Sequence, residues 1–314
     1  MGSTGDIELT PEELAKREEA AAGYKGPDRV IDNIEFWDIE KRKSRSPERI
    51  YKSGLPTLDS KTEGFESGEV WAVTGPAKHG KTTLCDTIGR NISRNGTNVL
   101  WFSFEMSPRK FLAKYKAADA PVIYIPLKLV PNTLDWIEAK VLEAKVKFDC
   151  RVVFIDHLHF IADMRRLMQN SSLEIGLIMR FLKQRIAIQH NVCVFLIAHM
   201  TKTTFGKNEE PSADDIRDSS FVKQEADGSI VVYRKAAKGK KATDDEPFGN
   251  KARIIIDNAR RSGVMRVRIN AIKVGDDLVE EAIGEELEPP IETPLREGSN
   301  GYEPEEPPVR ELGF

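Results

Sequence analysis

A glycine-rich run in this chain has the residue types and spacing that bind phosphate groups. Residues 75–82 read Gly-Pro-Ala-Lys-His-Gly-Lys-Thr and fit the pattern G-x-x-x-x-G-K-[ST] in full. In such a loop backbone N–H groups surround the phosphates, Lys81 adds a positive charge beside the β and γ phosphates, and the Thr82 hydroxyl binds Mg²⁺. The pattern predicts a site for ATP, or another nucleoside triphosphate, with Mg²⁺. The expected nucleotide-binding residues are Gly75, Pro76, Ala77, Lys78, His79, Gly80, Lys81, Thr82 and Thr83.

Two acidic residues and a histidine each come directly after an apolar run that predicts a strand. These residues are Asp156, Glu105 and His199. The carboxyl ends of parallel strands meet at one edge of an open α/β sheet, where such folds keep their sites. We therefore expect Asp156 to hold Mg²⁺ together with Thr82. We expect Glu105 to orient the attacking water as a base, and His199 to contact the γ phosphate.

The elements that must position these residues alternate between strands and helices. Predicted strands cover residues 68–74, 98–104, 122–125, 151–155, 192–198, 229–233, 252–257 and 265–272. Predicted helices cover residues 82–94, 108–118, 132–147 and 173–189. Strands and helices that alternate at this spacing imply right-handed crossovers. The expected fold class is α/β, with a central, mainly parallel sheet flanked by helices.

The composition is that of an ordinary soluble chain. Its 314 residues carry a formal net charge of −3, so any contact with nucleic acid must come from local basic loops. The three cysteines lie far apart, which predicts buried thiols in a reducing compartment. No apolar run is long enough to span a membrane. We therefore expect a cytoplasmic protein without membrane contact, in the host cytoplasm if the source is viral.

The amino-terminal residues 1–50 are expected to form an arm. Thr10-Pro11-Glu12-Glu13 predicts the start of a polar helix that runs to about Ala22. Residues 38–50 are charged and basic, and we interpret them as a solvated connector.

The remaining chain divides into a domain and a tail. The α/β domain is expected over residues 51–280, with a polar, mobile hairpin loop at 234–251. Residues 281–314 are rich in Glu and Pro, and such a segment cannot bury enough surface to become ordered. This tail is either a solvated segment or an acidic peptide that binds a basic partner protein.

Several motifs together resemble those of hexameric replicative DNA helicases of the bacterial DnaB type, a family that includes phage primase–helicases and mitochondrial Twinkle. The resemblance covers residues 51–275. The similar segments are S-G-L-P-T-L-D at 53–59, S-F-E-M-S at 103–107, V-F-I-D-H-L at 153–158, and D-I-R-D-S at 215–219 followed by Q-E-A-D at 224–227. The last run is the most specific. The resemblance implies a RecA-like P-loop NTPase core that hydrolyses ATP, translocates 5′ to 3′ on single-stranded DNA and unwinds duplex DNA.

The resemblance also implies a catalytic site shared between subunits of a ring-shaped homo-oligomer, expected to be a hexamer. Arg260 matches the family's arginine finger, which reaches the γ phosphate of a neighbouring subunit. The family's nearby lysine is replaced by Asn258, and Arg261 is the candidate substitute. His199 is typical of phage members, because bacterial members usually carry glutamine there. By position alone, the helix at 11–22 corresponds to the family's linker helix, which packs on the neighbouring motor domain.

Two loops are implied to face a central channel for DNA. Positive side chains and backbone amides are sufficient to hold the backbone of a single strand. The expected DNA-binding residues are Arg165, Arg166, Lys202, Lys207 and Arg217. The implied partners are single-stranded DNA and a primase, polymerase or loader.

Two other functions stay open at this point. One is a RecA-like recombination ATPase that forms open filaments, against which the segments at 103–107 and 215–227 argue. The other is a helicase loader or ATP-dependent switch without unwinding activity, which the altered finger run at 258–263 permits. The sequence is compatible with six or seven subunits and with a DNA or RNA track.

Overall fold

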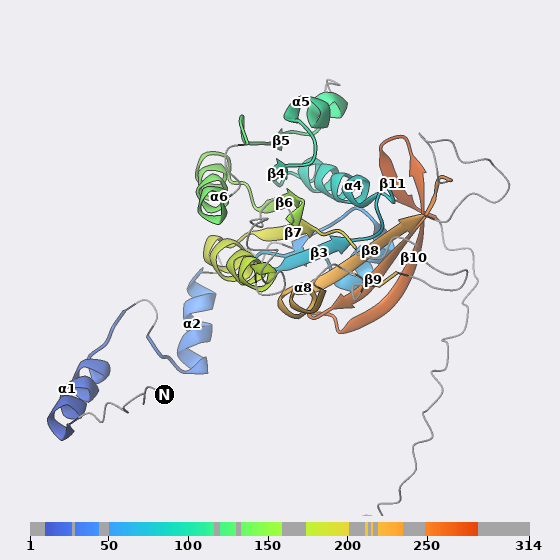
Figure 1. The fold of residues 1–314 in the computed structure, drawn as a ribbon. Coiled ribbons are helices and arrows are strands. Elements are labelled where there is room, and N and C mark those ends of the chain that lie inside the picture. Colours follow the sequence, from blue (N-terminus) through green and yellow to red (C-terminus); the bar gives the residue numbers. More distant parts are fainter. Residues whose placement is uncertain are drawn as a thin grey trace, which may run out of the picture. The chain divides into compact units, whose positions relative to one another are not determined.

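The computed structural model describes residues 10–26, 29–43, 50–115, 120–129, 133–158, 174–200, 211–212, 215, 219–234 and 249–281. Across the described residues from 50 onward, a nine-stranded sheet lies between two layers of helices (Figure 1). The order of its strands is β11-β10-β9-β8-β3-β7-β6-β4-β5. The predicted α/β class with a mainly parallel central sheet is confirmed.

The parallel part of the sheet carries the candidate site. Its strands are β3 (Val70–Thr74), β4 (Val99–Ser103), β5 (Ile123–Tyr124), β6 (Val152–Asp156), β7 (Cys193–Ile197) and β8 (Gly228–Arg234). Every residue of β3, β4, β6 and β7 is buried, as expected for strands covered on both faces. Three antiparallel strands extend the sheet beyond β8: β9 (Lys251–Ala259), β10 (Val264–Val274) and β11 (Asp277–Glu280).

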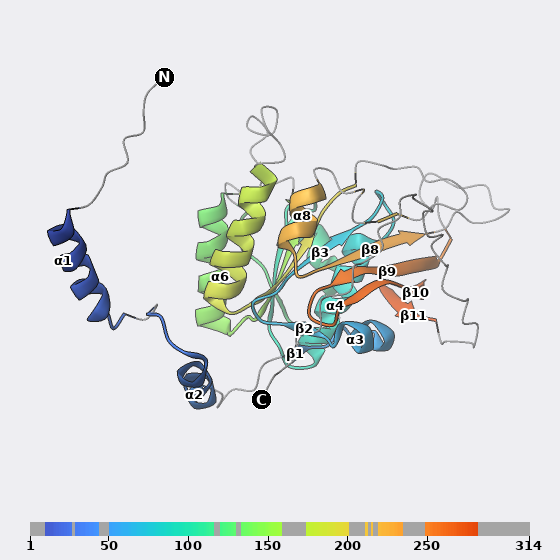
Figure 2. The same ribbon diagram turned by 90° about the horizontal axis from the view of Figure 1, so that it is seen from below.

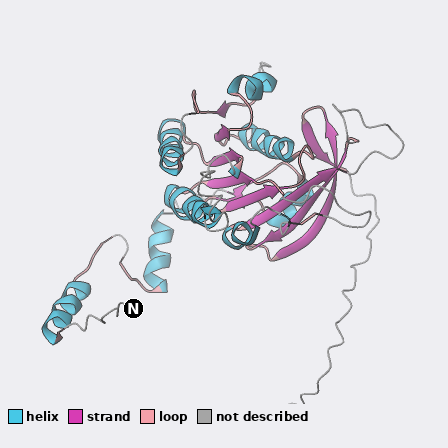
Figure 3. Cartoon of the chain, viewed as in Figure 1, coloured by secondary structure: helices cyan, strands magenta, loops and turns pink. Residues whose placement is uncertain are grey.

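Helices lie on both faces of the sheet (Figures 2 and 3). Alternate residues of the strands pack against different helices. One face is covered by α3 (Pro56–Thr62), α4 (Lys81–Arg94) and α5 (Pro108–Phe111). The other is covered by α6 (Leu134–Phe148), the helical residues 174–190 and α8 (Ser219–Glu225). Phe154 stacks on Trp101 with ring centroids 4.5 Å apart and on Phe195 at 4.7 Å. This aromatic row joins β4, β6 and β7, the three strands whose ends carry the predicted polar residues.

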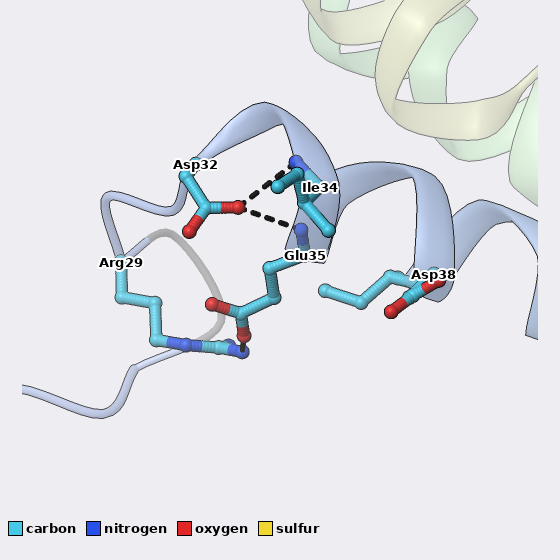
Figure 4. Close-up of a pocket in the computed structure, with 6 residues that line it drawn as sticks. Arg29, Asp32, Ile34, Glu35 and Asp38 are labelled. Carbon is cyan, nitrogen blue, oxygen red and sulfur yellow. Dashed lines mark hydrogen bonds and ion pairs between the residues drawn. The ribbon is translucent and has the colours of Figure 1, made fainter.

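The amino-terminal arm contains two helices. The predicted helix is confirmed as α1 (Pro11–Ala22), which begins with a capping box between Thr10 and Glu13. A second helix, α2 (Asn33–Lys43), was not predicted, and it includes the first part of the segment 38–50, whose interpretation as a solvated connector stays a prediction. The Asp32 carboxylate starts α2, because its Oδ1 accepts the N–H groups of Ile34 at 2.9 Å and Glu35 at 2.7 Å (Figure 4).

The predicted helix at 108–118 divides into two shorter turns. Helix α5 ends at Phe111, and a 3₁₀ helix, η1, covers Leu112–Tyr115. Lys114 Nζ lies 2.7 Å from the Asp86 carboxylate of α4, and the Tyr115 hydroxyl donates to the same group. These tertiary contacts hold the tighter turn.

Several other elements were not predicted from the sequence, because they are short or depend on tertiary contacts. They are β1 (Ile50–Tyr51), which pairs with β2 (Phe65–Glu66), and α3, α8 and β11, together with a π-helical segment, η3 (Leu182–Ile188), inside the predicted helix at 173–189. The three cysteines are buried, as predicted. No helix within the described ranges has the length and apolar character needed to cross a membrane. Residues 235–248 and 282–314 lie outside the described residues, and the boundaries 1–50, 51–280 and 281–314 stay predictions.

Candidate functional site at the carboxyl edge of the sheet

The phosphate loop connects β3 to α4 and has three residues at positive φ, two of them glycines. Gly75, Lys78 and Gly80 have φ angles of 149°, 65° and 100°. A Cβ atom on Gly75 would lie 2.0 Å from the carbonyl oxygen of Val232, so β8 approaches the loop too closely for any larger residue. The loop leads directly into the amino end of α4. Free N–H groups and the helix dipole favour an anion at such an end.

Two side chains of the first turn of α4 face the carbonyls and carboxylate around the loop. The Lys81 side chain is buried, and its Nζ donates to the carbonyl oxygens of Gly75 and Pro76, each at 3.0 Å. Thr82 Oγ1 donates to Asp156 Oδ2 at 3.0 Å. The two residues expected to hold Mg²⁺ are therefore in direct contact, although they lie on different elements.

The surroundings of Asp156 suit a cation. Its side chain is buried at 1% exposure, and its Oδ1 has no hydrogen-bond partner within the described part of the chain. Burial raises the pKa of Asp156 to about 6, against the opposing effect of the Thr82 hydrogen bond. Oxygen atoms of hydroxyl and carboxylate groups are the ligands that Mg²⁺ prefers. The residues present thus fit the ion that the motif implies.

The charge of Lys81 is balanced by acidic neighbours. Burial lowers the pKa of its ammonium group, and the nearby carboxylates of Asp156 and Glu105 counteract that effect. A bound phosphate would counteract it further. A negatively charged phosphate beside Lys81 would therefore stabilise its buried ammonium group.

His79 joins the phosphate loop to the end of β8. Its Nδ1 accepts the backbone N–H of Arg234 at 2.9 Å. Burial lowers the pKa of His79 to about 4, and the positive charges of Lys81 and Arg234 act in the same direction. The ring is therefore neutral near pH 7, as its acceptor role requires.

Three side chains converge beyond the ends of β4, β6 and β7. Glu105, His157 and His199 each place one ligand-type atom within 4.8 Å of the others. The two imidazole rings meet edge to face with centroids 4.1 Å apart. His157 is buried at 9% exposure, His199 is half-buried, and Glu105 is exposed. The sequence singled out Glu105 and His199 but missed His157, whose signal was its place directly after Asp156 at the same strand end.

Arg260 lies at the opposite edge of the sheet. It begins the turn between β9 and β10, where its N–H donates to the Asp227 carbonyl at 2.8 Å and its guanidinium donates to the Gln224 carbonyl. Because β9 runs antiparallel to β8 and ends beside Gly228, this turn lies at the amino ends of the parallel strands. The five residues of β3 span about 15 Å. That length separates Arg260 from the phosphate loop of its own chain.

Arg261, the candidate substitute for the family's lysine, is engaged within its own chain. Its guanidinium lies 3.0 Å from Glu69 and 3.5 Å from Glu63, and it donates to the Gly64 carbonyl at 2.6 Å. Asn258 contacts the Ser229 hydroxyl across β8 and β9. These contacts argue against Arg261 as a second finger.

Asp227, at the end of the Q-E-A-D run, has a positioning role that the sequence did not reveal. Its carboxylate accepts the N–H of Val70 at 2.7 Å and binds Lys183 Nζ at 2.7 Å. Its carbonyl also holds Arg260. The run therefore fixes the start of β3 and the turn that carries the candidate finger. The five expected DNA-binding residues, Arg165, Arg166, Lys202, Lys207 and Arg217, lie outside the described residues.

Comparison with known proteins identifies the family. The model of the DnaB-like helicase C terminal domain matches residues 51–128 and 128–274. The chain belongs to this family. This match confirms the resemblance that was inferred from the sequence motifs.

Curated relatives are similar over part of their length. A probable replicative DNA helicase of Trieres chinensis is 26% identical over 58% of this chain and 47% of the relative. Replicative DNA helicase DnaB of Geobacillus stearothermophilus is 26% identical over 70% of this chain and 55% of the relative. Replicative DNA helicase DnaB of Haemophilus influenzae is 26% identical over 83% of this chain and 63% of the relative. The DnaB-like chain spans about half the length of the first two relatives.

Solved structures share the fold. A DnaB-like replicative helicase, solved in a study of its interactions with primase, aligns with a TM-score of 0.62 at 20% identity, over 85% of this chain and 70% of that chain. A solved ATPase domain aligns with a TM-score of 0.60 at 19% identity, over 80% of this chain and its own whole length. Both solved proteins therefore share the α/β fold of this chain.

Proposed function

We propose that this chain is the motor of an ATP-dependent replicative DNA helicase that forms a ring, expected to be a hexamer. In this proposal it translocates 5′ to 3′ on single-stranded DNA and unwinds duplex DNA. The observation that carries the proposal is the contact between Thr82 and Asp156 beside a complete phosphate loop, in a chain of the DnaB-like family. Similar proteins named as replicative DNA helicases support the choice of activity.

Each proposed catalytic residue has a defined task. Lys81 and the N–H groups of residues 75–80 neutralise the phosphates, while Thr82 and Asp156 hold Mg²⁺. The ion, when bound, offsets the charge that develops on the β and γ phosphates. Glu105 orients the attacking water and takes its proton, and His199 contacts the γ phosphate. The effect of Glu105 on the pKa values of Lys81 and Asp156 supports its proximity to the reaction.

The neighbouring subunit supplies Arg260. Its position at the opposite sheet edge supports a role in trans, since the phosphate loop of its own chain is out of reach. An arginine finger provided in trans accelerates hydrolysis by about 10³–10⁵. ATP hydrolysis in this proposal therefore requires the assembled ring.

The remaining proposed contacts involve the arm and the channel. Helix α2 exposes Phe36 at 46% and Trp37 at 58%, which makes it a better candidate than α1 for a helix that packs on a neighbouring subunit. The loops with Arg165, Arg166, Lys202, Lys207 and Arg217 are proposed to hold single-stranded DNA. A primase, polymerase or loader is a proposed partner, in a cytoplasmic setting.

An unwinding assay on forked DNA tests the proposal. Full-length protein with ATP and Mg²⁺ is expected to separate a fork with a 5′ single-stranded tail and to leave a duplex with only a 3′ tail intact. Lys81→Ala is the control without hydrolysis. ATP hydrolysis without unwinding would contradict the helicase proposal and favour a loader or switch. Strand exchange between homologous DNAs would favour a recombination ATPase.

A further inference from the structure

The cluster of Glu105, His157 and His199 stands on a rigid frame. Ser103 pairs with Asp156 in the parallel ladder, and Asp156 pairs with Ile197, so the three strands end at the same level. The Phe104 N–H donates to the Asp156 carbonyl at 2.8 Å, which extends the ladder to the residue before Glu105. The backbone therefore fixes where the three side chains begin.

A hydrogen-bonded anchor also fixes the residue before His199. The N–H of Ala198 donates to the Val73 carbonyl at 2.9 Å, and its carbonyl accepts the Thr74 hydroxyl at 3.0 Å. The residue before His199 is thus held against the end of β3, the strand that leads into the phosphate loop. A ligand bound to His199 would sit within a preformed site.

The donor atoms of the cluster suit a different cation from Mg²⁺. Two imidazoles and one carboxylate are a common ligand set for Zn²⁺, which leaves a fourth position for water. Mg²⁺ prefers oxygen ligands and keeps several waters. Nitrogen ligands therefore select a transition metal over Mg²⁺.

The distances in the cluster permit such a site. Ligand atoms at about 2.0–2.2 Å from a tetrahedral Zn²⁺ lie roughly 3.4 Å apart. The three candidate atoms lie within 4.8 Å of one another. Because Glu105 is exposed, its side chain has room to rotate toward the two imidazoles without moving the core.

We propose that Glu105, His157 and His199 form a second cation site, distinct from Thr82 and Asp156, that binds Zn²⁺ and stops ATP hydrolysis when filled. The inhibitory part rests on the proposed function, in which Glu105 is the base. A carboxylate bound to Zn²⁺ cannot take a proton from water. Lys81 and Thr82 remain available, so nucleotide still binds.

Calorimetric titration of Zn²⁺ into chelator-treated, nucleotide-free full-length protein, with Mg²⁺ in excess, tests the site directly. The expected result is one Zn²⁺ per chain. Glu105→Gln and His157→Gln should each weaken binding at least about tenfold. Glu105 is exposed, so Glu105→Gln removes a ligand without a folding defect. His190→Gln is the matched control, because His190 is also buried (7% exposed) but pairs with Glu138 elsewhere.

The ATPase rate at fixed Mg²⁺ gives the second readout. Added Zn²⁺ should inhibit the unmodified chain and the His190→Gln variant, and should inhibit His157→Gln only at about tenfold higher concentration. Absence of Zn²⁺ binding, or binding that both ligand variants keep, would overturn the site. Binding without inhibition would support the site but contradict the role of Glu105 as base, so the two proposals fail in distinguishable ways.

Discussion

Thr82 and Asp156 are joined by a hydrogen bond of 3.0 Å between Oγ1 and Oδ2. Thr82 lies in the first turn of α4 and Asp156 at the last position of β6. The bond brings a hydroxyl and a carboxylate together at the point where the phosphate loop ends. The other oxygen of the same carboxylate, Asp156 Oδ1, is buried and has no hydrogen bond in the described part of the chain. An Mg²⁺ ion would satisfy that oxygen.

Replacement of the proposed base should separate nucleotide binding from hydrolysis. Glu105→Gln keeps the size of the side chain but cannot take a proton, so the ATPase rate should fall by about 10²–10⁴. The dissociation constant for a fluorescent ATP analogue should stay within about twofold. The matched control is Glu143→Gln on α6, whose partners are Lys140 and Lys147 and which should hydrolyse ATP normally. A Glu105→Gln protein with normal turnover would exclude Glu105 as the base.

The close contact between β8 and the phosphate loop predicts a large effect of one methyl group. In Gly75→Ala the new Cβ would overlap the Val232 carbonyl, which should reduce the free energy of unfolding by about 2–4 kcal/mol. ATP binding should also be lost. Gly96→Ala is the control, because Gly96 also has positive φ (83°) but no atom within 4 Å of its Cβ position. We expect it to cost only about 1 kcal/mol in urea unfolding. Equal losses in the two variants would contradict the contact.

The neutral state of His79 predicts a pH-dependent stability. The pKa of His79 is about 4 in the folded chain against an ordinary value of 6.5, so the unfolded state binds the extra proton first as the pH falls. The free energy of unfolding should therefore decrease between pH 6.5 and 4, by about 1–2 kcal/mol from this half-buried group. His79→Asn keeps an acceptor for Arg234 but does not titrate. The difference in the free energy of unfolding between the two proteins should be constant above pH 7 and should change progressively below pH 6.5. A difference that stays constant down to pH 4 would show that His79 does not titrate as stated.

Sequence patterns were sufficient for the part of the site that depends on strand ends. Apolar runs located β4, β6 and β7, and parallel pairing then brings Glu105, Asp156 and His199 to one edge. The phosphate loop follows from the G-x-x-x-x-G-K-[ST] pattern placed between an apolar strand and a helix. These inferences succeed because a strand's end and its neighbours are set by local composition and chain direction.

Other features could not be predicted because distant contacts determine them. The 3₁₀ turn at Leu112–Tyr115 depends on Asp86, which lies on another helix. The engagement of Arg261 by Glu63 and Glu69 requires the β9–β10 turn to lie beside α3 and β2. His157 was missed because its one sequence signal, a place directly after Asp156 at the strand end, is weak until the fold brings His199 beside it.

The position of Arg260 predicts complementation between two inactive variants. Arg260→Ala should lower the ATPase rate by about 10³ or more if Arg260 is the finger that acts on a neighbour's nucleotide, as proposed. Lys81→Ala should be inactive through its own phosphate loop. In mixed rings, a Lys81→Ala subunit can supply Arg260 to the intact loop of an Arg260→Ala subunit. Mixing the two purified proteins should restore part of the rate, and a mixture with no activity would show that Arg260 does not act across an interface.

The most direct test of the central claim is the ATPase rate of size-fractionated protein with Mg²⁺, measured with and without single-stranded DNA. A ring-forming helicase motor predicts strong stimulation by DNA, confined to the fraction of ring size. Hydrolysis that is indifferent to DNA, or equal in monomer and ring, would contradict both the channel loops and the finger in trans, and would favour a loader or switch.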